Sequence, residues 1–192
     1  NPQYQAAAPE KGDYTESYQA VYHEHILQMI EKRPWLWATH VWNLFDFAAD
    51  GRDEGGKHGE NQKGLVTIDR KTKKDAFYLY KAAWNKKEPF VHLCGKRYVD
   101  RTEDVTEVKV YSNQPKVTLV VDGKEFETQT GKTIFKFNVP ITGEHTITAI
   151  ADSCTDNITV KKVEKENPDY IFVKRSPITN WFDADELDPE CF

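Results

Sequence analysis

The sequence predicts an α/β segment followed by an all-β sandwich. Two observations favour this fold class. A helical apolar pattern near the N-terminus runs directly into an apolar stretch, and from about residue 89 short β-rich runs recur between turns. A polar linker that contains a proline, at 85–90, separates the helical pattern from the β-rich pattern. We therefore expect three regions: 1–88, 89–163 and an irregular tail at 164–192.

The first predicted element is a helix over about 14–32. Asp13 and Glu16 have the spacing of a capping box, and Pro34 ends the pattern. Apolar and aromatic residues recur three and four positions apart between these limits, which places them on one face of a helix. They are Tyr18, Val21, Tyr22, His25, Ile26, Met29 and Ile30.

The stretch "WLWATHVWNLF", at 35–45, is the most apolar run of the chain. It lacks the alternation of a strand with one wet face, so it predicts a strand buried on both faces, as in a parallel sheet covered by helices. The following residues, 48–63, are rich in glycine and charge and predict a long functional or mobile loop. "KKDAFYLYKAAW" then predicts a second amphipathic helix.

From residue 91 to 163 the pattern predicts about seven strands of a small antiparallel sandwich. Asp122-Gly123 is a tight-turn signal between two of them. The predicted strands are 91–93, 105–112, 116–122, 124–130, 133–139, 145–152 and 157–163. The tail after Glu164 predicts irregular structure with one apolar anchor at Trp181 and Phe182.

Charge and hydropathy exclude several classes of partner. The net charge is −5, which gives no electrostatic case for nucleic acid or for an anionic membrane surface. No apolar run is long enough to span a bilayer, and the first residues lack the pattern of a signal peptide. Because Met29 is the only methionine, we expect a mature or shortened fragment.

The cysteines and acids predict neither a metal site nor a cofactor. Cys94, Cys154 and Cys191 are odd in number and widely spaced, which is no disulfide framework and no zinc pattern. A Cys94–Cys154 bridge stays open. The acids of 50–60 fit no calcium-loop spacing and read as a solvated loop. His23 and His25 lie two apart on a helix, so they face different sides.

Trp42, Asn43 and Asp46 are the candidate binding residues. They come at the end of the apolar run, where strands of α/β folds present ligand sites. An aromatic ring offers a flat floor to the C–H face of a sugar, and amide or carboxylate groups pair with its hydroxyls. The alternatives are that Trp42 packs in the core and that Asn43 and Asp46 cap the strand end and the loop turn.

"RPWLWATHVWNLFDF" together with "KGLVTIDRKTKKDAFYLYKAAW" resembles the end of the catalytic (β/α)₈ TIM barrel of family 2 glycoside hydrolases, especially bacterial β-galactosidases of the Bacteroides type. The resemblance covers about residues 14–163. It implies that 36–43 is the last barrel strand, that 74–84 is the last barrel helix, and that about 89–163 is the immunoglobulin-like domain that follows. The chain would hold only the last helix-strand-helix units of the barrel.

The resemblance also implies which site residues are here and which are not. These enzymes retain configuration and use two glutamates, a nucleophile and an acid/base. Neither glutamate motif occurs in this chain, so we expect the catalytic pair upstream of Asn1. Trp42 would stack under the sugar of the first subsite, with Asn43 close by. Asp46 matches an acidic, structural position, and the 48–62 loop would rim the pocket.

The resemblance implies that the chain is the C-terminal part of a retaining hydrolase of terminal β-galactosides or related β-glycosides. We expect the chain to be inactive by itself. It would bind carbohydrate only as part of the full-length enzyme. The alternative is a non-catalytic sandwich module that binds glycan or protein. Periplasmic or extracellular location is an expectation of the family. Because a severed barrel exposes apolar surface, we expect residues 1–84 to pack against the sandwich or against another copy of the chain.

Overall fold

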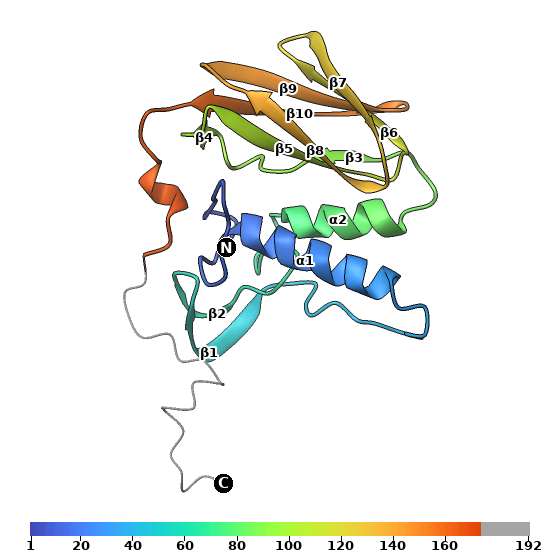
Figure 1. Ribbon diagram of the computed structural model, residues 1–192. Coiled ribbons are helices and arrows are strands. Elements are labelled where there is room, and N and C mark those ends of the chain that lie inside the picture. The colour runs from blue at the N-terminus through green and yellow to red at the C-terminus, as the bar shows by residue number, and fades with distance from the viewer. Residues whose placement is uncertain (174–192) are drawn as a thin grey trace, which may run out of the picture.

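The computed structural model describes residues 1–173, apart from the side chains at 51–54. Within these residues it has two α-helices, ten strands and one short 3₁₀ helix. Figure 1 shows three layers: a β-sandwich, the pair of helices beneath it, and the β1–β2 hairpin on the far side of the helices. Neither α1 nor α2 has both the length and the apolar character that crossing a membrane requires.

Helix α1 spans Glu16–Glu31 and begins with a side-chain cap. Thr15 is the N-cap, and its hydroxyl accepts a hydrogen bond from the Tyr18 amide at 2.9 Å. Asp13 accepts hydrogen bonds from the amide and the hydroxyl of Thr15, so it supports the cap and is not the capping residue itself. The capping-box prediction therefore placed the cap two residues too early.

Helix α2 spans Asp75–Trp84 and joins α1 to the sandwich. One apolar cluster contains Leu27 of α1, Leu79 of α2 and Tyr111 of the sandwich, all nearly inaccessible to solvent. Burial of such side chains is worth about 1.5–3 kcal/mol each. The helices are thus fixed to the sandwich by a shared core, and part of the expected packing of 1–84 against the sandwich is present.

The glycine-rich stretch expected to be a loop forms an antiparallel hairpin. Strand β1 spans Phe47–Glu54 and strand β2 spans Lys57–Asn61. Gly55 and Gly56 make the turn with φ angles of +59° and +82°, which residues other than glycine rarely adopt. The loop prediction at 48–62 was wrong because glycine at these positions serves a tight turn.

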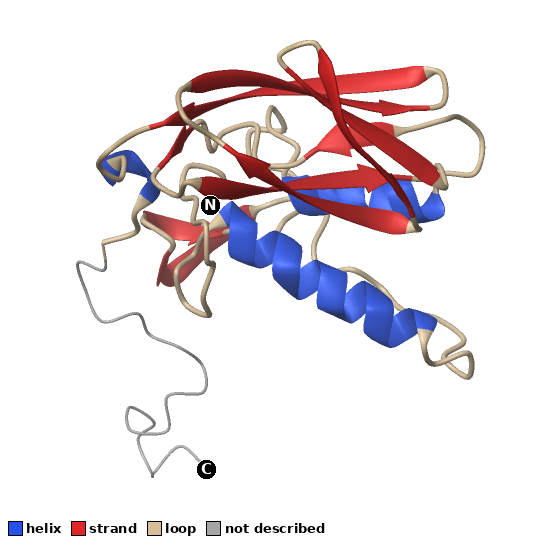
Figure 2. Cartoon of the chain, turned by 45° about the horizontal axis from the view of Figure 1, so that its top comes forward, coloured by secondary structure: helices blue, strands red, loops and turns tan. Residues whose placement is uncertain are grey.

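The sandwich consists of a five-stranded sheet and a three-stranded sheet (Figure 2). The order is β4-β10-β9-β6-β7 in the first sheet and β3-β5-β8 in the second, and only the β10–β4 pair is parallel. The strands are β3 (Val91–Leu93), β4 (Asp100–Arg101), β5 (Val105–Ser112), β6 (Lys116–Val121), β7 (Lys124–Thr130), β8 (Thr133–Pro140), β9 (Glu144–Ala151) and β10 (Cys154–Lys162). The 3₁₀ helix η1 (Pro168–Tyr170) follows them.

Alternating burial places one face of each sheet in a common core. In β8, Phe135, Phe137 and Val139 are buried and the residues between them are exposed. They pack with inward residues of the other sheet, such as Leu119 and Ile147. The immunoglobulin-like assignment and the boundaries at 88/89 and 163/164 stay predictions.

The predicted fold class is corrected in its first part, because the structure contains no fragment of a TIM barrel. The run 35–45 forms no regular strand; only Phe45 makes an isolated bridge, with Val66. Its side chains are outside rather than buried on two faces: Trp37 is 96% exposed and Trp35 is 72% exposed. The molecule is mostly β, with two helices packed against sheets.

Two further expectations have definite outcomes. Cys94 and Cys154 are free thiols, so the bridge left open between them is absent. The apolar anchor at Trp181 and Phe182, like Cys191, lies outside the described residues.

Candidate functional site

Two segments distant in sequence run side by side and carry the candidate site. The amides of Leu65 and Val66 donate to the carbonyls of Asn43 and Leu44, each at 3.0 Å. The Asp46 amide donates back to the Val66 carbonyl at 2.8 Å. Segment 43–46 is therefore held beside segment 63–66 by backbone hydrogen bonds. This pairing brings Trp42 and Lys63 to the same cavity. The Trp42–Asn43 peptide bond is cis.

A buried ion pair lies under this junction. The ammonium of Lys74 is 2.8 Å from Oδ1 of Asp46, and the same oxygen accepts the Gly64 amide at 2.8 Å. Burial raises the pKa of Asp46 and lowers the pKa of Lys74, against the attraction between them. A side chain at Gly64 would put its Cβ 2.0 Å from the Asp46 backbone nitrogen. The close approach therefore requires glycine.

A cavity of about 290 Å³ lies between this junction and helix α1, and more of its lining surface is apolar than polar. Trp42, 70% exposed, forms one wall, and its ring meets Phe47 edge-on at a centroid distance of 6.1 Å. The lining residues are Asn1, Tyr14, Thr15, Tyr18, Gln19, Tyr22, His23, Trp42, Gln62 and Lys63. The cavity thus combines aromatic walls with amides and one cation, and none of its lining residues is acidic.

Two glutamines give the cavity hydrogen-bond acceptors. The Gln19 amide nitrogen donates to the Gly64 carbonyl at 3.0 Å, which orients the side chain. Oε1 of Gln19 and Oε1 of Gln62 are buried and have no partner among the described residues. A buried acceptor without a partner costs free energy. Because neither oxygen is accessible to solvent, a ligand in the cavity reaches them only after the side chains turn.

His23 is a neutral wall of the cavity. Its Nδ1 is hydrogen bonded to the Tyr80 hydroxyl at 2.9 Å. Burial, with the charge of Lys74 adding to it, lowers the pKa of His23 to about 4. Near neutral pH the cavity therefore carries its positive charge on Lys63 and not on His23.

Lys63 and Asn61 are residues that sequence reasoning missed. Oδ1 of the buried Asn61 accepts the Lys63 amide at 3.0 Å, which fixes the backbone at the cavity rim. The Lys63 side chain is exposed and makes no ion pair with any described side chain. The available signal in the sequence was a lysine close to two amide residues in "ENQKG". That Lys63 lies near Trp42 depends on the backbone pairing described above.

The three predicted binding residues have different places. Trp42 lines the cavity. Asn43 is outside the lining, and its Oδ1 accepts the Leu44 amide at 2.6 Å. Asp46 is beneath the junction, with 2% of its surface exposed, and holds Lys74. Its place agrees with a structural role rather than with direct contact to a ligand.

No family model matches the chain. A β-glucuronidase of Bacteroides fragilis is 40% identical over 158 residues, which are 79% of this chain and 23% of that protein. Among solved structures, an FMN-binding β-glucuronidase from Faecalibacterium prausnitzii is 50% identical, with a TM-score of 0.87, over 90% of this chain and 27% of that one. A candidate β-galactosidase of Bacteroides fragilis is 33% identical, with a TM-score of 0.76, over 86% and 26%.

The homologues of this chain are glycoside hydrolases. The chain spans about a quarter of the length of these relatives. The resemblance therefore extends over both the helical layer and the sandwich, and it concerns one part of each of these enzymes.

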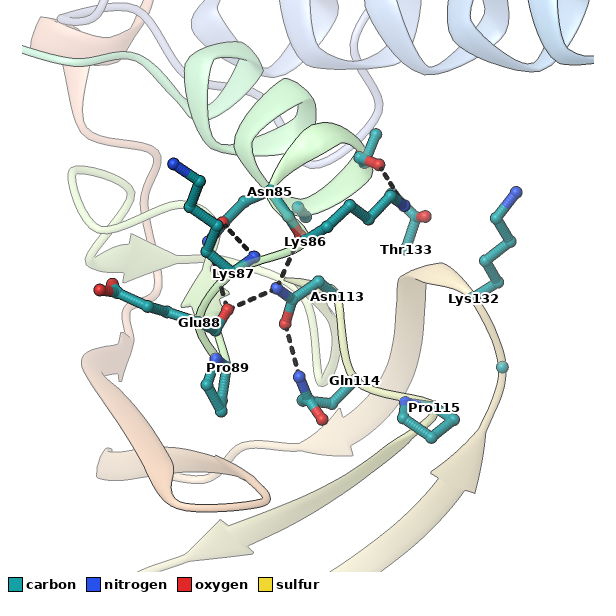
Figure 3. Close-up of a pocket in the computed structure, with 13 residues that line it drawn as sticks. Asn85, Lys86, Lys87, Glu88, Pro89, Asn113, Gln114, Pro115, Lys132 and Thr133 are labelled. Carbon is teal, nitrogen blue, oxygen red and sulfur yellow. Dashed lines mark hydrogen bonds between the residues drawn. The ribbon is translucent and has the colours of Figure 1, made fainter.

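This glycoside-hydrolase homologue has a second pocket, at the junction of α2 with the sandwich (Figure 3), which we call the lysine groove. It has a volume of about 350 Å³, and Lys86, Lys87 and Lys132 are among its lining residues. Asn113 organises it by donating to the carbonyls of Asn85 and Glu88, at 3.0 and 2.7 Å. None of its lining residues carries an aromatic ring. The groove is basic and polar, in contrast to the aromatic cavity at Trp42.

Proposed function

We propose that this chain is one part of a longer retaining glycoside hydrolase of family 2 and supplies a wall of its sugar pocket, with β-glucuronides as substrates. The observation that carries the proposal is the pairing of an exposed aromatic ring, Trp42, with an exposed cation, Lys63, in one cavity. The homologues named as β-glucuronidases and β-galactosidase support the reaction class.

The cation distinguishes between the two substrate classes. A glucuronide carries a carboxylate where a galactoside carries a neutral hydroxymethyl group. The ammonium of Lys63 suits the carboxylate, and Asn61 positions its backbone. Trp42 would stack on the ring face. The side chains of Gln19 and Gln62 would have to turn toward the cavity before their amide oxygens accept sugar hydroxyls.

The cavity contributes binding rather than proton transfer. Retaining hydrolysis needs two carboxyl groups about 5 Å apart. The residues that line the cavity include no aspartate and no glutamate, and His23 has its Nδ1 engaged by Tyr80. In this proposal the catalytic carboxylates belong to another part of the longer enzyme.

The test is Lys63→Gln in the full-length enzyme, assayed on chromogenic β-glucuronide and β-galactoside. A hydrogen bond to a charged group is worth about 1.5–3 kcal/mol, so kcat/KM for the glucuronide should fall by roughly 10- to 100-fold. Turnover of the galactoside should stay unchanged. Lys57→Gln, an exposed lysine of the neighbouring strand, is the control.

Equal losses on both substrates would contradict the role of Lys63, since a merely structural effect does not distinguish a carboxylate from a hydroxymethyl group. The 192-residue chain alone should show no turnover of either substrate. Turnover by the chain alone that survives repurification would overturn the assignment of the catalytic pair to another part of the enzyme.

The FMN named for the F. prausnitzii relative does not transfer to the lysine groove of this chain. Figure 3 shows the side chains of Lys87 and Lys132 on opposite sides of the groove, and the Lys132 ammonium is 2.9 Å from Oε1 of Glu31. The groove offers no aromatic ring against which the flavin could stack. The residues present therefore do not fit the whole group, and no step is assigned to it.

A further inference from the structure

A cluster of reactive side chains lies outside the lining of the cavity at Trp42, where helix α2 meets the sandwich. Asp75 is the first residue of α2, His92 is in β3, and Cys94 follows β3 directly. One ligand-type atom from each of the three lies within 4.8 Å of the others, and all three residues are buried. Buried carboxylate, imidazole and thiol groups are thus gathered at one point.

The surrounding groups hold these side chains in place. The Gly95 amide donates to Oδ2 of Asp75 at 2.8 Å, and Nε2 of His92 is 3.0 Å from Oδ1 of Asp75. The Tyr78 ring stacks on the His92 ring with centroids 3.8 Å apart. The cluster is therefore preorganised, with little freedom to be lost on binding a ligand.

The outer nitrogen of His92 faces another carboxylate. Nδ1 of His92 is 3.5 Å from Oδ2 of Asp156, which also accepts the Leu93 amide at 2.8 Å. A proton on Nδ1 would leave the lone pair of Nε2 on the side of Asp75. A carboxylate behind the histidine is the usual outer partner of a histidine that binds a metal.

The cluster also has an opening. A cavity of about 310 Å³ reaches Asp75 and Cys94 from the side of the first residues of the chain and of α1. It provides an entry path and room for a water molecule as a fourth ligand. Of the nearby cations, Arg97 is paired with Glu16 and Lys109 with Glu24. Arg101 lines the same cavity and donates to the Tyr98 carbonyl and the Thr106 hydroxyl, and it makes no ion pair with any described side chain.

We propose that Asp75, His92 and Cys94 bind a divalent transition metal ion of the zinc class, with water as the fourth ligand. A mixed sulfur, nitrogen and oxygen donor set favours Zn²⁺ over Mg²⁺ or Ca²⁺, which prefer oxygen alone. On binding, the S–H bond of Cys94 breaks, the sulfur–metal bond forms, and the proton leaves to solvent. No electron is transferred.

The test is a titration of the tag-free chain with Co²⁺ as a spectroscopic substitute for Zn²⁺. The titration uses the variant Cys154→Ser/Cys191→Ser, in which Cys94 is the only thiol. We expect one equivalent of Co²⁺ to give thiolate-to-metal charge-transfer absorption, with release of protons, and Zn²⁺ to displace it. Cys94→Ser should abolish that absorption.

An outer-partner variant separates a metal site from a simple buried His–Asp pair. Asp156→Asn should weaken metal binding by roughly 10- to 100-fold. Asp104→Asn, at an exposed carboxylate paired with Lys162, should leave it unchanged.

Three results would overturn the proposal: no stoichiometric uptake of Zn²⁺ by the wild-type chain in equilibrium dialysis, charge-transfer absorption that persists in Cys94→Ser, or uptake without proton release. The dialysis and the proton measurement need no variant, so they decide the question even where Cys94→Ser fails to fold.

Discussion

His23 shows how one buried side chain couples the helical layer to pH. The ring lies between α1 and α2, hydrogen bonded to Tyr80 and in edge contact with its ring at a centroid distance of 5.5 Å. Burial favours the neutral imidazole, so the pKa of His23 falls from 6.5 to about 4. The folded state therefore binds fewer protons than the unfolded state between these two values.

We expect the free energy of unfolding to fall as the pH drops from about 6.5 towards 4, with His23 contributing about 3 kcal/mol of that loss. The sign follows because the unfolded imidazole takes up a proton that the folded one refuses. Urea denaturation across this pH range measures it. His23→Gln should flatten the curve, and His25→Gln, at an exposed position of the same helix, should not. An unchanged slope in His23→Gln would contradict the assignment.

At the scale of elements, the Asp46–Lys74 pair fastens three pieces of chain. Lys74 is the N-cap residue of α2, Asp46 precedes β1, and the Lys74 ammonium also donates to the Gln62 carbonyl at 3.0 Å. Both side chains are almost wholly buried. Such a pair adds little net stability, but loss of one partner leaves a buried charge without compensation.

Lys74→Met should therefore lower the free energy of unfolding by about 3–5 kcal/mol. The double variant Asp46→Leu/Lys74→Met should be more stable than Lys74→Met alone, because it removes the stranded carboxylate as well. Chemical denaturation of Asp46→Leu, Lys74→Met and the double variant measures the coupling, with Lys73→Met, at the exposed neighbouring position, as the control. Additive losses in the double variant would show that the pair does not act as a unit.

The elements of the sandwich were predictable because their information is local. β-branched and aromatic residues between turn signals marked 91–93, 105–112 and 124–130 with the bounds that the structure has. The run 35–45 misled because an apolar stretch without alternation is typical of a doubly buried strand. Nothing in its pattern says whether the layers that would bury it are present, and here its tryptophans are exposed.

The candidate sites divide in the same way. Trp42 was predictable from an aromatic residue at the end of an apolar run. Lys63 was not, because its approach to Trp42 depends on pairing between 43–46 and 63–66. The cluster of Asp75, His92 and Cys94 was not predictable from spacing, because packing of α2 against β3 brings together residues that no metal-binding pattern links.

At the scale of the whole molecule, the exposed side of segment 35–44 is an apolar surface on a charged protein. Its large exposed side chains are Trp35, Leu36, Trp37, Trp42 and Leu44. Contiguous apolar patches on soluble proteins mark interaction surfaces. We propose that this surface makes the isolated chain self-associate.

Sedimentation velocity should show a weight-average sedimentation coefficient that rises with concentration, and the chain should bind a hydrophobic dye. Trp35→Ser/Trp37→Ser should reduce both effects. Trp84→Ser, at an exposed tryptophan of α2 outside this segment, should reduce them less. A compact monomer that binds no dye would contradict the proposal.

The fastening of the β1–β2 hairpin at its base has an evolutionary consequence. Asp46 at its start, and Gln62 and Gly64 at its end, are all tied to one another or to Lys74. Because the base is closed independently of the tip, insertions or deletions between 47 and 61 would leave Trp42 and Lys63 facing the same cavity. We expect natural variation in length to concentrate here, and the hairpin to accept grafted segments that reach over the cavity from its rim.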